Sequence, residues 1–452
     1  MATIARALAR VKEDYSKLLG SEAIGRACQA CDHAFRNSLL APVRLIHLFL
    51  LQILHGNTAI SHLKHLVDFE FTESAYCQAR QRLPLEVLTY LFATILDTLK
   101  TAGKSVGLWH GHRTFHIDGT GVSMPDTPKL RKFFGIPGKR RKGCGFPVGH
   151  LLAMFDAGTG LLLDMFASTW RTHDMSQASQ MHPKLRPGDV LVGDRAFCSF
   201  AHLALLLRDK LHGLFRMHQR VIINFLPGRR CHRDCAKRYR KAGMPTSRWI
   251  KKLGRFDQLV EWFKPAQRPT WMTAKQYQAL PESIILREFR YRIQQPGFRV
   301  RVVTAVTTLL DPQRYPVEEL AELYLARWQI ETNFRHLKIT MKMDVLKCKT
   351  VEGVMKELMM FAMVYNLVRA VMIQAATQQN VTPQRISFID ALRWLCHALW
   401  TDCPLKLKVN PLRPGRAYAR ARKRWHKSYP ILTKSRSKKP QTMQAERVNG
   451  LS

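Results

Sequence analysis

Acidic residues are scarce in this 452-residue chain. Asp and Glu number 33 against 72 Lys and Arg, so the formal net charge is 72 − 33 = +39. Self-repulsion on this scale opposes compact folding, and a polyanionic partner would relieve it. The excess favours nucleic acid, because phosphate neutralisation supplies most non-specific affinity for DNA and RNA. A ribosome-associated protein and a binder of anionic membranes are the alternatives that charge leaves open.

A disulfide framework is also missing. The ten cysteines are scattered over a long chain without dense, even spacing, which is typical of reduced thiols in a cytosol. Two short groups leave structural zinc open: Cys28 with Cys31, and Cys231 with His232 and Cys235. Each is only a partial ligand set for a four-coordinate zinc ion.

Long uninterrupted apolar runs are absent as well. Residues 45–54 are too short to span a bilayer, and residues 358–376 contain Asn366 and Arg369. The N-terminus is too interrupted by charge for a secretory signal. We expect both runs to be buried helices and the protein to be soluble, cytoplasmic and without a membrane partner.

Enough apolar residues are present, at 46%, to build a sizeable core, and the length predicts two to four domains. Periodicity predicts an α/β protein with five regions. These are a helical N-terminal domain (1–105), a first α/β part (106–220), a β-rich insertion (221–308), a helical last part (309–376) and a basic C-terminal region (377–452). The tail from residue 404 interleaves Arg and Lys with aromatic residues, which indicates either a solvated tail or an arm on the DNA backbone.

Two acids follow predicted strands. A strand over residues 113–118 ends at Asp118, and a buried strand over residues 190–192 leads into Gly193 and Asp194. Sites in α/β proteins form where strands end, so both carboxylates are candidate functional groups. A turn or a helix cap is the alternative for either acid taken alone.

A third acid lies in a periodic run, residues 317–343, that predicts one long helix. At roughly 100° per residue, four polar side chains fall within an arc of about 60°, with Arg335 at its edge. They are Tyr324, Arg327, Glu331 and Lys338. An exposed face with an ordinary Arg327–Glu331 ion pair is the alternative.

Three carboxylates brought together by a mixed sheet would bind hard divalent cations through oxygen. Two such ions activate the attacking oxygen and stabilise the leaving one in phosphoryl transfer. The ordered acids therefore predict metal-dependent chemistry on a phosphodiester.

These motifs resemble the DDE transposases of bacterial insertion sequences, more narrowly the insertion-sequence-4 family. That family is marked by I-D-G-T at its first acid, G-D-R-x-F at its second and Y-x2-R-x3-E-x6-K at its third. They stand here at residues 117–120, 193–197 and 324–338. Residues 74–84 and 361–369 also look like segments of the family, so the resemblance covers about residues 70 to 375.

The resemblance implies a ribonuclease-H-like core with the β-rich insertion before the third acid, and an N-terminal domain that binds DNA. It implies two Mg²⁺ ions, replaceable by Mn²⁺, held by the catalytic carboxylates of Asp118, Asp194 and Glu331. The residues implied to contact DNA are Tyr324, Arg327 and Lys338, and we add Arg335 and Arg195.

The implied activity is cut-and-paste transposition of an insertion sequence, on element ends and target DNA, by a homodimer in a synaptic complex. The implied location is the bacterial cytoplasm, at the nucleoid through DNA. A base-stacking aromatic is expected from the insertion, with Trp249, Trp262 and Trp271 as candidates. A nuclease of the same fold without strand transfer and a catalytically idle DNA-binding regulator remain the rival interpretations.

Overall fold

The computed structural model describes residues 4–102, 107–137, 145–172, 174–231, 243–293, 301–399, 401 and 403–412. Most of the basic tail, from residue 413, lies outside these residues, as do His232 and Cys235 of one predicted zinc group.

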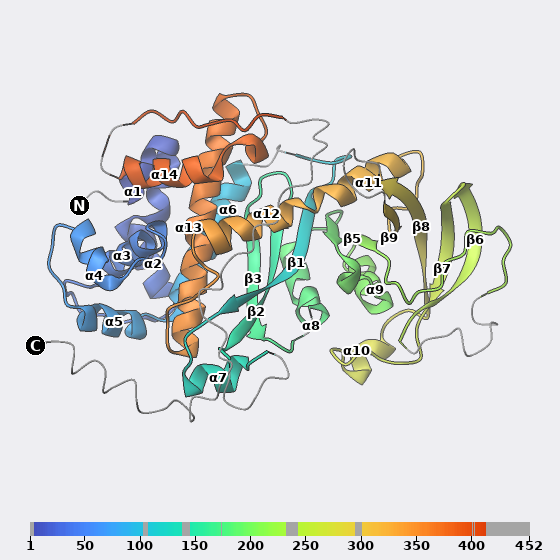
Figure 1. The fold of residues 1–452 in the computed structure, drawn as a ribbon, viewed down its shortest axis with the longest axis horizontal. Coiled ribbons are helices and arrows are strands. Elements are labelled where there is room, and N and C mark those ends of the chain that lie inside the picture. The colour runs from blue at the N-terminus through green and yellow to red at the C-terminus, as the bar shows by residue number, and fades with distance from the viewer. Residues whose placement is uncertain are drawn as a thin grey trace, which may run out of the picture.

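One mixed sheet of nine strands runs through the molecule in the order β3-β2-β1-β4-β5-β9-β8-β7-β6 (Figure 1). Strands β1, β4 and β5 are parallel neighbours, and every other pairing is antiparallel. The strands are Thr114–Ser123 (β1), Val148–Asp156 (β2), Leu162–Thr169 (β3), Val190–Gly193 (β4), His212–Arg216 (β5), Thr246–Gly254 (β6), Asp257–Phe263 (β7), Ser283–Ile293 (β8) and Arg301–Thr307 (β9). The predicted mixed α/β class is therefore confirmed.

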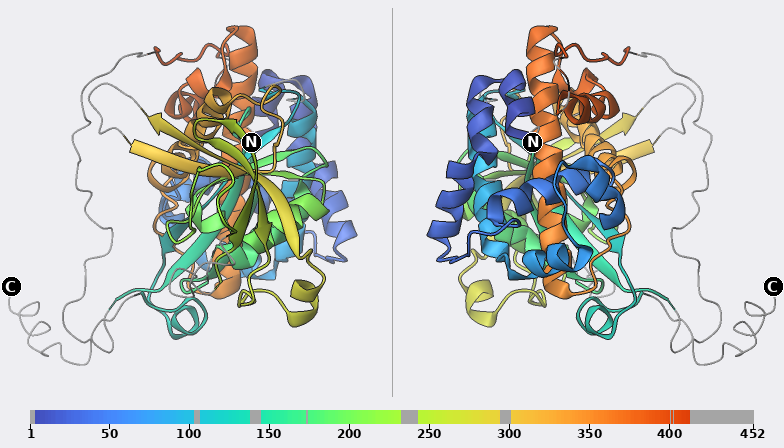
Figure 2. Two further views of the ribbon diagram at one scale, coloured as in Figure 1. Left: turned by 90° about the vertical axis from the view of Figure 1, so that its right-hand side faces the viewer. Right: turned by 90° about the vertical axis from the view of Figure 1, so that its left-hand side faces the viewer.

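The strands of the predicted β-rich insertion continue the same sheet. Strand β9 pairs with β5 through Leu214↔Thr307 and Phe215↔Val306, so β6 to β9 extend the sheet beyond β5. Figure 2 shows this long sheet strongly twisted when viewed from the β6 end, as right-handed strand twist requires.

Helices occupy the N-terminal region and flank the sheet (Figure 1). Several begin where the sequence supplies a cap: the hydroxyl of Thr72 caps α5, and Thr273 with Gln276 forms a capping box on α10. The helices are Ile4–Val11 (α1), Ser21–Ala30 (α2), Pro42–Leu54 (α3), Ile60–Leu63 (α4), Glu73–Arg82 (α5), Leu85–Ala102 (α6), Pro128–Phe134 (α7), Met175–Ala178 (α8), Phe200–Arg208 (α9), Ala274–Gln278 (α10), Val317–Ala326 (α11), Gln329–Arg335 (α12), Val351–Gln378 (α13) and Phe388–Ala398 (α14).

Helix α13 is the core helix that joins the N-terminal helices to the sheet. It packs against α3, α6, α14 and β3, and stands among the N-terminal helices in Figure 2. By length and composition alone it could cross a membrane, but 89% of its most apolar window is buried inside the protein. The predicted buried helix is confirmed.

The polar residues of α13 hold the turn between β2 and β3. The amide of Asn366 accepts from the Leu162 N–H at 2.8 Å and donates to the Leu162 carbonyl at 2.9 Å. The buried guanidinium of Arg369 donates from Nε to the Thr159 carbonyl at 3.0 Å. These contacts explain how a polar and a charged residue are accommodated in an apolar helix.

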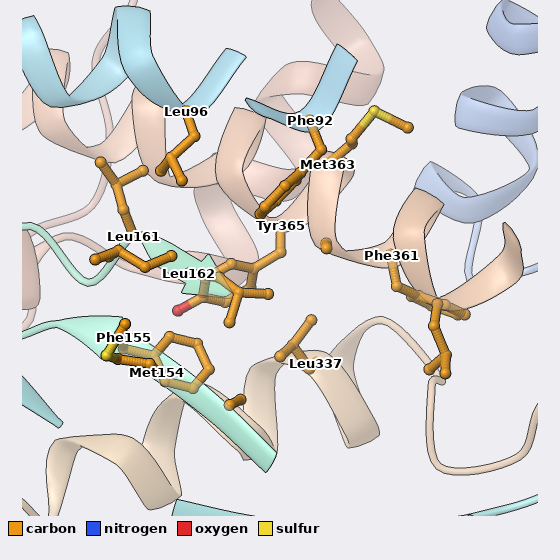
Figure 3. Packing of buried hydrophobic residues seen from close by; sticks show 14 of the residues in the cluster. Phe92, Leu96, Met154, Phe155, Leu161, Leu162, Leu337, Phe361, Met363 and Tyr365 are labelled. Carbon is orange, nitrogen blue, oxygen red and sulfur yellow. The ribbon is translucent and has the colours of Figure 1, made fainter. Parts of the chain in front are cut away.

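Apolar side chains from distant segments meet in one core around Tyr365 (Figure 3). Phe155 of β2 contacts the Tyr365 ring edge-on at 5.8 Å, and Leu337, just after α12, lies in the same cluster. Phe92 and Leu96 of α6 close it from the N-terminal side. The helix that carries the third acid is thus seated on the same core as the sheet.

Two sequence predictions are wrong in detail. Strand β1 does not end at Asp118, because its antiparallel pairing with β2 continues to Ser123↔Val148. The predicted helix over residues 317–343 is broken, because the N–H groups of Arg327 and Trp328 bond to carbonyls three residues back and tighten the chain between α11 and α12. A π-helical turn, His336–Thr340, follows α12. The four polar residues therefore do not lie on one straight helix.

Arg369→Ala is expected to lower the free energy of unfolding by on the order of 3 kcal/mol, because it removes a charged hydrogen bond and leaves the Thr159 carbonyl buried without its donor. Urea unfolding followed by circular dichroism measures this. Arg393→Ala is the matched control, since Arg393 is exposed on α14. Equal stability of the two variants would contradict the role assigned to Arg369.

Candidate active site

The parallel pairing of β1 with β4 places Asp118 beside Asp194. The register runs from Thr114↔Val190 to Ile117↔Gly193, and the residue that follows each of the last two partners is an acid. A side chain at Gly193 would come within 2.9 Å of the Phe197 ring and 3.2 Å of Ile117. Glycine therefore permits the close packing that brings the two acids together.

Backbone N–H groups fix one oxygen of each carboxylate. Oδ1 of Asp118 accepts from the Gly119 N–H at 2.8 Å. Oδ1 of Asp194 accepts from the Ala196 N–H at 2.7 Å and caps the short 3-10 turn Arg195–Phe197. Both carboxylates are thus oriented by local structure before any ligand binds.

Burial raises the pKa of Asp118 to about 6. This pKa is the balance of burial and the neighbouring groups: the Gly119 N–H and the Arg327 guanidinium lower it, and the negative charges of Asp194 and Asp174 raise it. Like charges in a poorly solvated place disfavour the ionised form, and a cation would relieve them. The oxygen donors and their mutual repulsion fit a hard divalent cation.

Arg327, between α11 and α12, contacts the first acid. Its Nη1 donates to Asp118 Oδ2 at 3.2 Å, and its guanidinium lies 5.7 Å from the centre of the Tyr324 ring. Within the described part of the chain, its buried Nε has no hydrogen-bond partner. The guanidinium therefore keeps an unused donor beside the acids. Tyr324 itself is buried, and this burial raises its pKa.

Lys338 contacts β1 two residues beyond Asp118. Its Nζ donates to Thr120 Oγ1 at 3.2 Å, and burial lowers the pKa of its amine. Because Asp118 and Thr120 lie on the same side of the strand, Arg327 and Lys338 place two cationic groups along one face of β1.

Glu331 lies one turn past Arg327 on α12, which packs on β1 (Figure 1). Its side chain is exposed and forms no hydrogen bond or ion pair among the residues described. Across the same residues, no three His, Cys, Asp or Glu side chains form a group that could hold a metal ion. The structure thus brings Asp118 and Asp194 together, and does not bring Glu331 into a cluster with them.

The remaining predicted DNA contacts are exposed arginines. Arg195 follows Asp194 directly and donates to Gln219 Oε1 at 3.2 Å, and Arg335 lies in the last turn of α12. Arg195 also lines a cavity of about 750 Å³ between the second acid and the residues of the insertion. Arg171 and Arg268 line the same cavity, so three arginines contribute to its lining.

The three candidate tryptophans differ in their surroundings. Trp262 is fully buried and donates to Glu288 Oε1 at 2.8 Å, which excludes it as a stacking surface. Trp249 is half-buried on β6, at the end of the sheet. Trp271 is half-buried and lines the 750 Å³ cavity together with Arg195. Of the three, Trp271 is therefore the one that shares a cavity with Arg195, the residue after the second acid.

Sequence reasoning missed one aromatic residue. Trp328 directly follows Arg327 and is 55% exposed, with its ring 6.0 Å from the Arg327 guanidinium. An indole next to the motif's arginine was visible in the sequence, but its exposure depends on the break between α11 and α12. It is a second candidate stacking surface.

The cysteine groups gain no support as metal sites. Cys28 is buried, and burial raises the pKa of its thiol, which disfavours the thiolate that zinc requires. No third ligand joins Cys28 and Cys31 among the residues described. Cys231 is described, but its predicted partners His232 and Cys235 are not.

Comparison with known proteins agrees with these motifs. Residues 109–367 match the family described as Transposase DDE domain. The transposase InsG for insertion sequence element IS4 of Escherichia coli K12 is 26% identical over 341 residues, which cover 73% of this chain and 67% of that protein. The putative transposase InsZ of the same organism is 30% identical over 141 residues, covering 30% of this chain and 46% of InsZ.

A search of solved structures finds the piggyBac transposase synaptic complex with hairpin DNA. The two chains are 10% identical with a TM-score of 0.44, over 88% of this chain and 80% of the other.

Asp118→Asn is expected to stabilise the protein in the absence of divalent cations. The folded-state pKa of about 6 lies above the ordinary 3.8, so wild-type stability falls as pH rises through this window. At pH 8 the cost is on the order of 2 kcal/mol, reduced by partial solvent exposure, and near pH 4 most of it is lost because the folded-state carboxyl is protonated. Melting temperatures in a chelator at both pH values measure this. If the variant is less stable than the wild type at pH 8, the prediction is contradicted. Added Mg²⁺ is expected to stabilise the wild type and not the variant.

Proposed function

Because the chain belongs to the insertion-sequence-4 family of DDE transposases, we propose that it performs cut-and-paste transposition with Asp118, Asp194 and Glu331 as its catalytic carboxylates. The observation that carries this assignment is the β1–β4 register, which sets Asp118 beside Asp194 at the edge where β4 ends. The three acids occupy the three positions of the family motif in a protein otherwise poor in acids.

The catalytic core is proposed to be ribonuclease-H-like. Support comes from the sheet order β3-β2-β1-β4-β5, with an antiparallel meander followed by parallel strands, and from the acids on β1 and directly after β4. Strands β6 to β9 then belong to the insertion, and α11 and α12 return the chain to β1 with the third acid.

Asp118, Asp194 and Glu331 are proposed to hold two divalent cations, Mg²⁺ or in its place Mn²⁺. The donor chemistry supports the pair of Asp118 and Asp194, whose adjacent carboxylates need a counter-charge. Glu331 is the proposed third ligand because its helix packs on β1 one turn beyond the arginine that contacts Asp118. The bound cations would supply activation of the attacking oxygen and stabilisation of the leaving oxygen.

The chain's own cations are proposed to bind the substrate phosphates. Arg327 donates from Nη1 to Asp118, and a guanidinium held beside the acids suits a phosphate oxygen that binds there. Lys338 contacts Thr120, two residues beyond Asp118 on β1, so successive phosphates of one DNA strand could run over β1. Tyr324, packed under Arg327, steadies its guanidinium. Arg195 and Arg335 are proposed as additional phosphate contacts.

In the proposed reaction, water attacks the phosphodiester at the element's end, a new P–O bond forms and the 3′-oxygen leaves as a hydroxyl. That hydroxyl then attacks the phosphodiester of the opposite strand, which forms the hairpin and displaces the 3′-oxygen of the flanking DNA as a hydroxyl. A second water reopens the hairpin and displaces the 3′-oxygen of the element's end. This 3′-hydroxyl finally attacks a phosphodiester of target DNA, joins to its phosphorus and displaces the target's own 3′-oxygen as a hydroxyl. Because two ends must be cut and joined together, a homodimer in a synaptic complex is the proposed assembly.

The 750 Å³ cavity is proposed to receive a base displaced from the duplex. It is lined by Arg195, the residue after Asp194, together with Arg171 and Arg268, and has the Trp271 indole in its wall. Guanidinium groups bind phosphate and an indole stacks on a base, so the lining suits a nucleotide.

Asp194→Asn and Glu331→Gln are expected to lower cleavage of DNA carrying the element's ends by about 10³-fold or more, because each removes a proposed metal ligand. DNA affinity should change by less than about threefold, because the basic surface is kept. Glu322→Gln is the matched control, an exposed acid on α11.

The products of the wild type separate the rival functions. Cleavage followed by joining to target DNA supports transposition, whereas cleavage without joining would indicate a nuclease. Binding without cleavage by the wild type would overturn the catalytic assignment and indicate a regulator.

Trp271→Ala is expected to weaken binding of hairpin-forming DNA ends about 5- to 100-fold, because stacking on one base contributes roughly 1–3 kcal/mol. Trp271→Phe should retain most of the affinity, and Trp249→Ala should bind like the wild type. Fluorescence of an adenine analogue at the end position reports the unstacked base. The same loss in Trp328→Ala, with Trp271→Ala unaffected, would transfer the stacking role to Trp328.

A further inference from the structure

A hydrogen-bonded histidine–aspartate pair lies over strand β1 next to Asp118. His150 of β2 bonds through Nε2 to Oδ1 of Asp174, the residue that precedes α8. Both side chains are 21% exposed, so the hydrogen bond between them is largely shielded from solvent. Sequence reasoning assigned neither residue a role, and the proposed reaction does not use them.

The pair lies directly over Gly119, the glycine that follows Asp118. A Cβ atom at Gly119 would overlap Asp174 Oδ1 and would come within 2.8 Å of His150 Cε1. The absence of a side chain at this position is therefore what lets the pair close over β1. The glycine of the first-acid motif thus has a physical reason in this structure.

The pair lies on the opposite face of β1 from Arg327. His150 is the antiparallel partner of Gly121, so it shares the face of Gly119 and Gly121. Asp118 and Thr120, which contact Arg327 and Lys338, point to the other face. Asp174 is nevertheless close enough for its charge to act on Asp118.

The residues around Asp174 form one wall of the 750 Å³ cavity. Arg171, Thr172, Met175 and Ser176 line it on this side, and Arg195 with the residues after it line it beside the second acid. Helix α8 also packs against the short turn Arg195–Phe197. Through the His150–Asp174 bond, this wall is attached to β2, the strand that pairs with β1.

We propose that His150 and Asp174 are positioning residues, which fix the cavity wall to β2 beside the first acid so that Arg171 meets a phosphate of the DNA strand at the acids. This proposal rests on the proposed function of the site. His150 supplies the N–H that holds the Asp174 carboxylate, and Gly119 supplies the space. Neither residue touches the reacting phosphodiester; both act through Arg171.

The test measures the salt dependence of binding to a short non-specific DNA duplex, and separately kcat and KM for cleavage in Mg²⁺. His150→Ala and Asp174→Ala should each reduce the slope of log K against log [salt] by about 0.9, the loss of one phosphate contact, as should Arg171→Ala. Cleavage should fall by about 10- to 100-fold in each, as for other residues that orient a site. His150→Gln, whose amide can still donate to Asp174, should recover most of both.

The decisive comparison is the double variant. In the His150→Ala background, Arg171→Ala should cause no further loss of slope, because the arginine is already misplaced. His110→Ala is the matched control, since His110 also bonds a carboxylate, that of Glu319, but precedes β1 at its other end. It should bind and cleave like the wild type.

A wild-type slope in His150→Ala, or additive losses in the double variant, would overturn the proposal. If no variant changes the slope while His150→Gln melts at a lower temperature, the pair is purely structural, and this result overturns the proposal too. Because the slope is measured without cleavage, a wild type that binds but does not cut sinks the catalytic function and leaves this test standing.

Discussion

Two carboxylates held side by side are the constraint on which this structure depends. The β1–β4 register places Asp118 next to Asp194, and burial raises the pKa of Asp118 to about 6. Such a pair is unfavourable without counter-charge, and the chain supplies it from a helix distant in sequence through Arg327. The arrangement of the remaining groups follows: Lys338 continues the positive face along β1, and the His150–Asp174 pair closes the opposite face.

The succession of strands and helices along the chain could be predicted from sequence, because it depends on local patterns, and the same patterns single out the candidate acids. Apolar strand residues ending in Gly193-Asp194, and the fixed spacing from Tyr324 to Lys338, are visible without a structure. The buried character of α13 was also predictable, since Asn366 and Arg369 interrupt its apolar run and find partners in the β2–β3 turn.

The rest depends on partners that lie far away in the chain. The extension of β1 past Asp118 is set by pairing with β2, and the break between α11 and α12 by tight hydrogen bonds that no periodicity predicts. The exposure of Trp328 follows from that break. The bond between His150 and Asp174 has no sequence signal except the glycine at position 119. The need for that glycine becomes clear only in the structure, where both side chains occupy the space that a side chain at position 119 would fill.

Helix α13 has a consequence for how such a protein can change. It contacts α1, α3 and α6 on one side and β3 and α14 on others, so the N-terminal helices and the sheet share one hydrophobic core (Figure 3). A different N-terminal region could be grafted onto this sheet only if it reproduced the surface complementary to α13. Replacement of the whole N-terminal region during evolution is therefore restricted. Sequence changes in this region are expected mainly on the outer faces of its helices.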